Sequence, residues 1–152
     1  MRREMAEPSR DRAETVRGDY PRLPDAARSA LMRPRFEVVP VEGALEQAAL
    51  LPPRAEVSIT CSPTLGIENT LALAEKLSDR GFRAVPHVSA RLVTGEAHLE
   101  EILRRLDDSR LRDVFVVGGD VKEPAGPFAS GLELLRAMSR LGHGIQRIGI
   151  PA

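Results

Sequence analysis

Four polar residues, each within or directly after an apolar run, are candidates for chemistry: Glu37, Thr60, His87 and Asp120. A carboxylate within an apolar strand is costly unless it is paired, and burial raises its pKa. Glu37 in that setting suits a general acid at neutral pH, and a salt bridge, for example with Arg91, is the alternative. Asp120 follows a Val/Phe run that predicts a strand buried on both faces. At the carboxyl end of such a strand, where α/β folds keep ligand sites, Asp120 is the second candidate carboxylate.

The other candidates are weaker signals when each is taken alone. His87 has no neighbouring His or Cys, so no metal site is predicted, and its ring either donates to a ligand oxygen or is satisfied within the fold. Gly118 and Gly119 can present backbone N–H groups to a ligand, although the sequence lacks the G-x-G-x-x-G and Gly-Lys-Ser/Thr phosphate motifs. Ser130 is a candidate helix N-cap, and helix N-termini receive phosphates. Cys61, the single cysteine, is interpreted as a small hydrophobe.

Alternating strands and helices would position these residues from residue 35 onward. Strands are predicted at 36–41, 56–61, 82–90, 113–117 and 147–150, and helices at 43–51, 67–80, 95–109 and 129–141. Thr94 is the predicted N-cap of the third of these helices. This β-α-β order, about five strands and four helices, implies a parallel sheet with right-handed crossovers. A doubly wound sheet and the first part of a TIM barrel both fit the order.

Residues 1–34 differ from the rest of the chain. Arginines and acids alternate there with four prolines, and apolar periodicity is poor. This composition predicts a charged, flexible N-terminal arm, within which residues 25–32 could form a short helix. The folded part is then expected at residues 35–152.

The overall composition excludes several classes of partner. The chain has 152 residues with 22 basic and 22 acidic side chains, so nothing favours nucleic acid or an anionic membrane. Aromatic residues make up only 3%, which argues against stacking on single-stranded nucleic acid. No apolar run approaches the roughly 18 residues of a membrane helix. One cysteine allows no internal disulfide, which fits a cytoplasmic location.

Taken together, the strand ends resemble those of the methylenetetrahydrofolate reductase family, flavoproteins built on a (β/α)8 barrel. Phe36-Glu37-Val38-Val39-Pro40-Val41 is similar to the family's opening Phe-Glu-Phe-Phe-Pro-Pro, and Val57-Ser58-Ile59-Thr60 to its Val-Ser-Val-Thr. Pro86-His87-Val88-Ser89 stands for Pro-His-Leu-Thr, Gly118-Gly119-Asp120 for Arg-Gly-Asp, and Phe128-Ala129-Ser130 for Tyr-Ala-Ser. Order and spacing agree over residues 35–152, so the resemblance favours a partial TIM barrel over a doubly wound sheet.

The resemblance also implies a site and a reaction. Glu37 would be the general acid that helps open the five-membered ring of 5,10-methylenetetrahydrofolate. Asp120 would lie between the folate pterin and the flavin and tune both. The residues expected against FAD are Thr60, His87, Gly118, Gly119, Phe128, Ala129 and Ser130. NAD(P)H would reduce the flavin, and the reduced flavin would convert the folate to 5-methyltetrahydrofolate.

Three departures from the family pattern place the chain in a divergent branch. Gly118 stands where the family has Arg, which removes a cationic partner for the flavin. Phe128 stands for Tyr and lacks its hydroxyl, and Ser62-Pro63 replaces a small Gly-rich segment.

Length is a further departure. The family's fifth strand continues into Tyr-Pro-Glu and three more β/α units, whereas this sequence ends at Ile150-Pro151-Ala152. The resemblance therefore predicts a truncated reductase. One alternative is a non-catalytic fragment or half-barrel interaction module, whose open strand edges need a second copy or another chain. The other is a one-carbon folate enzyme that works without flavin.

Overall fold

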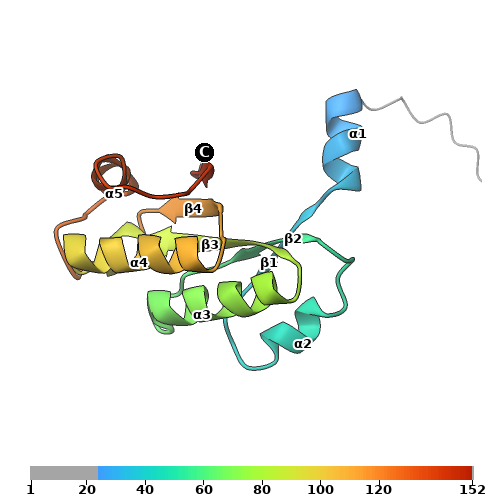
Figure 1. Cartoon of the computed structure of the whole chain (residues 1–152), viewed down its shortest axis with the longest axis horizontal. Helices are drawn as coiled ribbons and strands as arrows, with labels where there is room; N and C mark the ends of the chain where they lie inside the picture. The colour runs from blue at the N-terminus through green and yellow to red at the C-terminus, as the bar shows by residue number, and fades with distance from the viewer. Residues whose placement is uncertain (1–23, 152) are drawn as a thin grey trace, which may run out of the picture.

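The structure is a computed structural model that describes residues 24–151. Helices and strands alternate along this part of the chain, and the strands form one sheet (Figure 1). The strands are β1 (Arg35–Val38), β2 (Glu56–Ile59), β3 (Arg83–Ser89), β4 (Asp113–Val117) and β5 (Arg147–Gly149). The helices are α1 (Asp25–Met32), α2 (Ala44–Ala48), α3 (Gly66–Asp79), α4 (Glu96–Asp108) and α5 (Gly131–Met138), and a single 3-10 turn, Ala90–Leu92, follows β3. The predicted β-α-β order is confirmed, and several elements are shorter at their ends than predicted.

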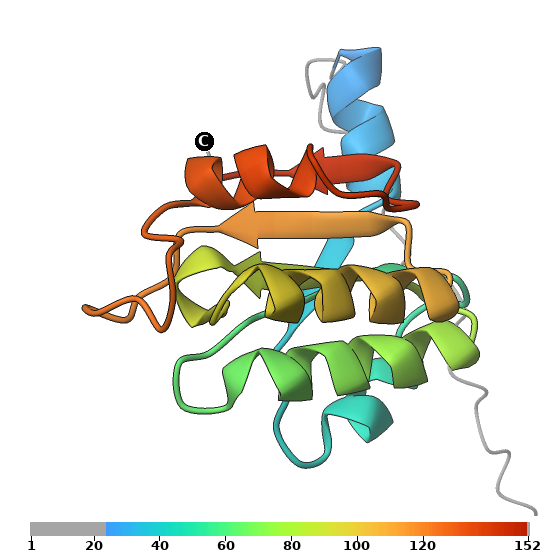
Figure 2. The same cartoon turned by 60° about the vertical axis from the view of Figure 1, so that its left-hand side comes forward.

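All five strands are parallel and lie in the sheet in their order along the chain, from β1 to β5. Figure 2 shows α3, α4 and α5 stacked in the same order along one face of the sheet. A doubly wound sheet reverses its strand order and carries helices on both faces. Neither feature is found among the described residues, so the doubly wound alternative does not describe residues 24–151.

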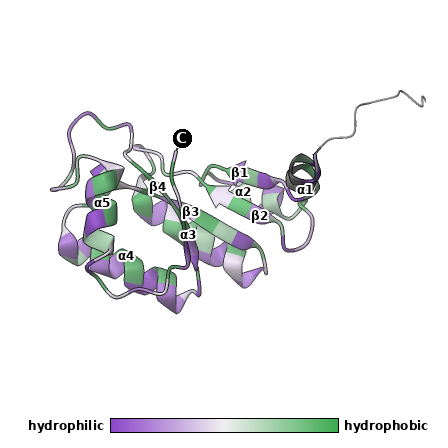
Figure 3. Ribbon diagram, turned by 90° about the horizontal axis from the view of Figure 1, so that it is seen from above, coloured by the Kyte–Doolittle hydropathy of each residue, from purple (hydrophilic) through white to green (hydrophobic). Residues whose placement is uncertain are grey.

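The hydrophobic core lies between the sheet and these helices. Alternate strand residues point to this face, and the buried ones are Val57, Ile59, Ala84, Val88, Val114 and Val116. Helix α4 meets them with Leu99, Ile102, Leu103 and Leu106, the spacing of one helix face. Figure 3 shows the hydrophobic and hydrophilic residues that alternate along α3 and α4. Each fully buried leucine contributes about 1.5–3 kcal/mol.

The prediction that β4 is buried on both faces is wrong. Val114 and Val116 are 1% exposed, whereas Asp113, Phe115 and Val117 on the other face are only half-buried. The reason is that helices cover only one face of the sheet, so the opposite face of β4 keeps partial contact with solvent. An apolar run alone could not distinguish these two situations.

Helices α3 and α4 end in the same backbone motif with different residues. In each, a backbone N–H just beyond the helix donates to a carbonyl five residues earlier: Phe82 N to Leu77 O at 3.1 Å in α3, and Leu111 N to Leu106 O at 2.8 Å in α4. The motif needs one residue in the left-handed conformation, which glycine adopts most readily. Helix α3 uses Gly81 (φ 85°), but α4 uses Arg110 (φ 57°).

The helix N-termini follow the sequence prediction in one case of two. Ser130 caps α5 in a capping box, because its Oγ accepts from Glu133 N at 3.3 Å and the Glu133 carboxylate accepts from Ser130 N. The prediction that Thr94 caps α4 is wrong, because the N-cap is Gly95. Thr94 instead bonds to His98 Nδ1 through both its hydroxyl and its backbone N–H, each at 3.1 Å.

The N-terminal region is described only in part. Helix α1 confirms that residues 25–32 form a short helix. Residues 1–23, the greater part of the predicted arm, lie outside the described residues.

Candidate functional site

The face of the sheet that the helices leave uncovered carries two of the candidate residues, Glu37 and His87. Residues paired in register lie side by side on one face of a parallel sheet, and alternate residues of a strand share that face. The residues on this uncovered face are Arg35 and Glu37 of β1, Glu56 and Ser58 of β2, Arg83, Val85, His87 and Ser89 of β3, Asp113, Phe115 and Val117 of β4, and Arg147 and Gly149 of β5. We call this face the open face.

His87 is the centre of a small polar cluster on the open face. Its Nε2 lies 2.8 Å from Ser58 Oγ, a hydrogen bond, and 3.9 Å from Glu37 Oε2. Its ring packs against Phe115, with the two ring centroids 4.9 Å apart. Four adjacent strands, β1 to β4, therefore contribute one side chain each, and the register of the sheet brings them together.

The cluster does not have the geometry of a hydrolase triad. In such a triad, one ring nitrogen of the histidine faces the nucleophile and the other faces the carboxylate. Here Ser58 and Glu37 both approach the same nitrogen, Nε2. The arrangement instead places an exposed carboxylate beside a histidine, where the carboxylate can exchange protons with a ligand.

Burial lowers the pKa of His87 below its ordinary value. Glu37 acts in the opposite direction with a smaller effect, and the positive charge of Arg35 lowers the pKa further. The His87 side chain is only 13% exposed, which explains why burial dominates. The neutral imidazole is therefore favoured at neutral pH.

The structure corrects the setting predicted for Glu37. The side chain is 63% exposed, so the carboxylate is not buried within an apolar strand. A salt bridge to Arg91 is also wrong, because the Arg91 guanidinium donates to the carbonyls of Ala129 and Val121. Glu37 is accessible to a ligand and has His87 as its neighbour.

Ser89 and Gly119 meet at the carboxyl end of the open face. The Ser89 hydroxyl is buried and has no hydrogen-bond partner within residues 24–151. Gly119 has φ +96°, and a Cβ at this position would lie 2.0 Å from Ser89 Oγ. Only glycine fits there, because both the conformation and the close approach exclude a side chain. The turn at 118–119 thus covers a polar atom that is still free to bond.

Asp120 lies in the loop that follows this turn. Its side chain is exposed and takes part in no hydrogen bond or ion pair with another described residue. The loop itself is held by Arg91, whose backbone N–H donates to Gly118 O at 3.0 Å and whose carbonyl accepts from Ala125 N at 2.8 Å. The structure thus places Asp120 at the carboxyl end of the sheet, on a loop held by the 3-10 turn that follows β3.

The remaining predicted cofactor residues have structural roles of their own. Thr60 donates its backbone N–H to Val38 O at 3.0 Å and accepts from the Thr70 hydroxyl at 2.9 Å, so its main chain ties β1, β2 and α3 together. Phe128 is 5% exposed and belongs to the core. Ala129 is exposed, and its N–H donates to Glu133 Oε2 at 2.6 Å.

Ser58 and Ser89 were not predicted from the sequence as site residues, and the structure adds both to the site. Each lies two residues from a predicted site residue: Ser58 on β2 precedes Thr60, which directly follows the strand, and Ser89 follows His87 on β3. The period of two in a strand could have found both. Cys61 remains outside this set, because burial raises the pKa of its thiol and disfavours the reactive thiolate.

No protein-family model matches the chain. Within the described residues, no group of three or more His, Cys, Asp or Glu side chains is arranged to hold a metal ion. The helices of this same region are all too short or too polar to cross a bilayer.

Proposed function

We propose that this chain carries the amino-terminal half of a methylenetetrahydrofolate reductase-like site. The observation that carries the proposal is the convergence of Glu37, Ser58 and His87 from three adjacent strands on the open face. The accessible Glu37 carboxyl would give a proton to the folate ring nitrogen as the ring opens, with the neutral His87 ring, bonded to Ser58, beside it. Asp120, on the fixed loop, would approach the pterin.

Two features support an arc of a (β/α)8 barrel as the underlying fold. Sequential strand order with helices on one face is the winding that a barrel requires. In addition, Arg147 of β5 reaches Glu56 of β2, with an N–O separation of 3.6 Å. Strands three places apart in a flat sheet are about 14 Å apart, so this contact favours an open face that is concave.

The donor set at the carboxyl end fits part of a flavin site. The unpaired Ser89 hydroxyl, the His87 ring and the backbone at Gly119 could hold the edge of an isoalloxazine ring. Phe128 and Ser130 contribute less, since the first is in the core and the second caps α5. When bound, FAD would relay hydride from NAD(P)H to the folate.

Titration of the purified chain with FAD, followed by quenching of flavin fluorescence, tests the cofactor. We expect saturable quenching that is weaker in His87→Ala and unchanged in His143→Ala, which alters a histidine in the loop after α5. Reduction of 5,10-methylenetetrahydrofolate by NAD(P)H should then be lost in Glu37→Gln, while its FAD binding persists. Absence of saturable FAD binding by the wild type would contradict the flavin-dependent proposal.

The second candidate is an interaction module that another chain completes. Strands β1 and β5 are the edges of the sheet, and Ile148 and Ile150 at the β5 edge are 40% and 61% exposed. An uncovered edge of this kind pairs readily with a further strand. A chain that fails to bind FAD and sediments as an oligomer favours this candidate. One that fails to bind FAD yet still reduces the folate favours the flavin-independent alternative.

A further inference from the structure

The segment that leads into α4 is fastened by the ring of a histidine. His98 is in the first turn of α4, and its Nδ1 accepts a hydrogen bond from the backbone N–H of Thr94 at 3.1 Å. The Thr94 hydroxyl lies at 3.1 Å from the same nitrogen. The side chain three residues after an N-cap often accepts a backbone N–H in this way, and it is usually a Glu or Gln. Here Gly95 is the N-cap and the accepting group is one that titrates.

The bond from Thr94 fixes where the proton of the neutral His98 ring lies. A backbone N–H is only a donor, so Nδ1 must be unprotonated and Nε2 carries the proton. Nε2 lies 3.4 Å from Glu68 Oε1 of α3, to which it can donate. A second proton on Nδ1 would set two donors against each other, and the Thr94 N–H would lose its acceptor. Histidine is the side chain that ordinarily gains such a proton between about pH 5 and pH 8.

The charged groups around the ring come from the two helices that flank it. Glu68 of α3 also pairs with Arg105 of α4, which in turn pairs with Glu75 at 2.9 Å. Within residues 24–151, Glu68 is the acid that forms an ion pair with His98. Nε2 carries a proton in both states of the ring, so the contact with Glu68 is kept in both. The bond from Thr94 is therefore the one that depends on protonation.

The segment fastened by His98 supports the loop 118–130. Gly126 of this loop packs directly on the backbone of Val93 and Thr94, because a Cβ at Gly126 would lie 2.5 Å from the carbonyl oxygens of both residues. Real side chains do not approach a backbone so closely, so glycine is required there. A displacement of Thr94 would therefore be transmitted to Gly126 and the loop.

We propose that His98 is a pH-dependent positioning residue for the loop 118–130, on which Asp120 lies. The neutral ring fixes Thr94 and so the surface on which Gly126 packs. Protonation releases the Thr94 N–H to water, and the loop loses part of its support while its bonds to Arg91 remain. The loop is then better ordered above the titration range of histidine than below it. The proposal concerns the loop alone and does not depend on the folate and flavin chemistry proposed above.

Hydrogen–deuterium exchange of the full chain at pH 8 and pH 5.5 tests the proposal, with protection expressed relative to the intrinsic exchange rate at each pH. The reporters are the amides of Thr94 and Ala125, and the second donates to Arg91 O at 2.8 Å and directly precedes Gly126. We expect the protection of both to fall about fivefold at the lower pH, the effect of one lost neutral hydrogen bond.

Three variants separate the proton from the fold. His98→Asn keeps an acceptor, since Asn Oδ1 takes the place of Nδ1, but does not titrate, so protection should stay at its high-pH level at both pH values. His98→Phe keeps a ring without an acceptor and should show the low-pH level at both. His143→Asn, which alters the histidine in the loop after α5, should respond to pH as the wild type does.

A fall in protection that persists in His98→Asn would overturn the proposal, because another group would then be responsible. Full protection in His98→Phe at pH 8 would overturn it as well. The ¹⁵N shifts of the wild-type ring at pH 8 give a check that needs no variant. They should identify an unprotonated Nδ1, and a proton on Nδ1 would contradict the bond from Thr94.

Discussion

His87 shows how a residue's setting decides its charge. A carboxylate lies 3.9 Å from its ring, an arrangement that by itself favours the imidazolium. Burial nevertheless outweighs the attraction to Glu37, because that carboxylate is largely solvated while the ring is not. The result is a neutral ring that can hold a hydrogen bond to Ser58 without adding positive charge to the site.

The lowered pKa of His87 predicts a specific pH dependence of stability. In the unfolded chain the pKa of His87 is near the ordinary histidine value of 6.5, so as the pH falls the unfolded chain takes up a proton before the folded chain does. The contribution of neutral His87 is therefore present above pH 6.5 and is lost as the pH falls through the folded pKa. Urea unfolding from pH 8 to pH 5 should show a steeper loss in the wild type than in His87→Gln. Equal slopes in the two proteins would contradict the assignment.

At the scale of elements, one arginine organises the loop on which Asp120 lies. Arg91 follows β3 and holds the loop 118–130 at four points. Its side chain donates to Ala129 O at 2.9 Å and Val121 O at 3.1 Å, and its backbone pairs with Gly118 and Ala125. The loop has no regular secondary structure, so these bonds and the capping box at its end determine its position.

Replacing Arg91 by Met should loosen this loop while leaving the sheet intact. The variant keeps both backbone bonds and the aliphatic stem but loses two charge-assisted bonds, so we expect loop amides to exchange about tenfold faster or more. Hydrogen–deuterium exchange over residues 118–130, compared with β2, measures the effect. Arg104→Met on α4 is the matched control, because Arg104 pairs only with Asp108 on its own helix. Unchanged exchange in the Arg91 variant would show that the side chain does not hold the loop.

At the scale of the whole molecule, a ladder of alternating charges connects all five strands. Each strand contributes its first residue: Arg35, Glu56, Arg83, Asp113 and Arg147. Arg147 donates to Asp113 through two nitrogens, and this hydrogen bonding is the main cause that holds the pKa of Asp113 below its usual range. Glu56 contacts three of the arginines, so it is the acid on which most of the ladder depends.

Glu56→Gln tests whether the ladder stabilises the sheet. It leaves three arginines with one carboxylate, and we expect a loss of about 1 kcal/mol in the free energy of unfolding at low salt. The loss should shrink at high salt, because partly exposed charges are screened. Urea unfolding at two salt concentrations, with Glu100→Gln on the exposed side of α4 as control, measures both effects. A salt-independent loss would point to packing instead of charge.

The sequence by itself determined the alternation of elements, because apolar periodicity, glycine stops and capping residues are local signals. It predicted α3, β4 and the Ser130 cap for this reason. It also selected Glu37 and His87, whose proximity follows from the parallel register of neighbouring strands.

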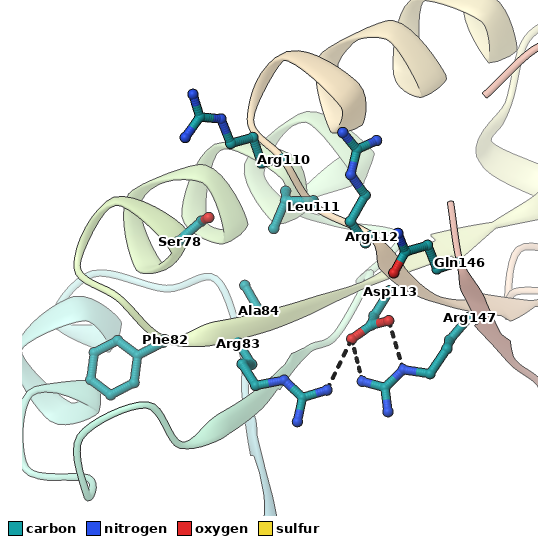
Figure 4. A pocket seen from close by; sticks show the side chains of 10 residues that line it. All are labelled: Ser78, Phe82, Arg83, Ala84, Arg110, Leu111, Arg112, Asp113, Gln146 and Arg147. Carbon is teal, nitrogen blue, oxygen red and sulfur yellow. Dashed lines mark hydrogen bonds and ion pairs between the residues drawn. The ribbon is translucent and has the colours of Figure 1, made fainter. Parts of the chain in front are cut away.

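Only the tertiary structure decided which face of each strand is covered. That choice depends on where the helices pack, which no local pattern encodes. As a result, Glu37 is exposed and one face of β4 is only half-buried, contrary to the sequence prediction. The tertiary structure also gathered Arg83, Asp113 and Arg147, distant in sequence, into one ion-paired group (Figure 4), because parallel strands bring their first residues to the same end of the sheet.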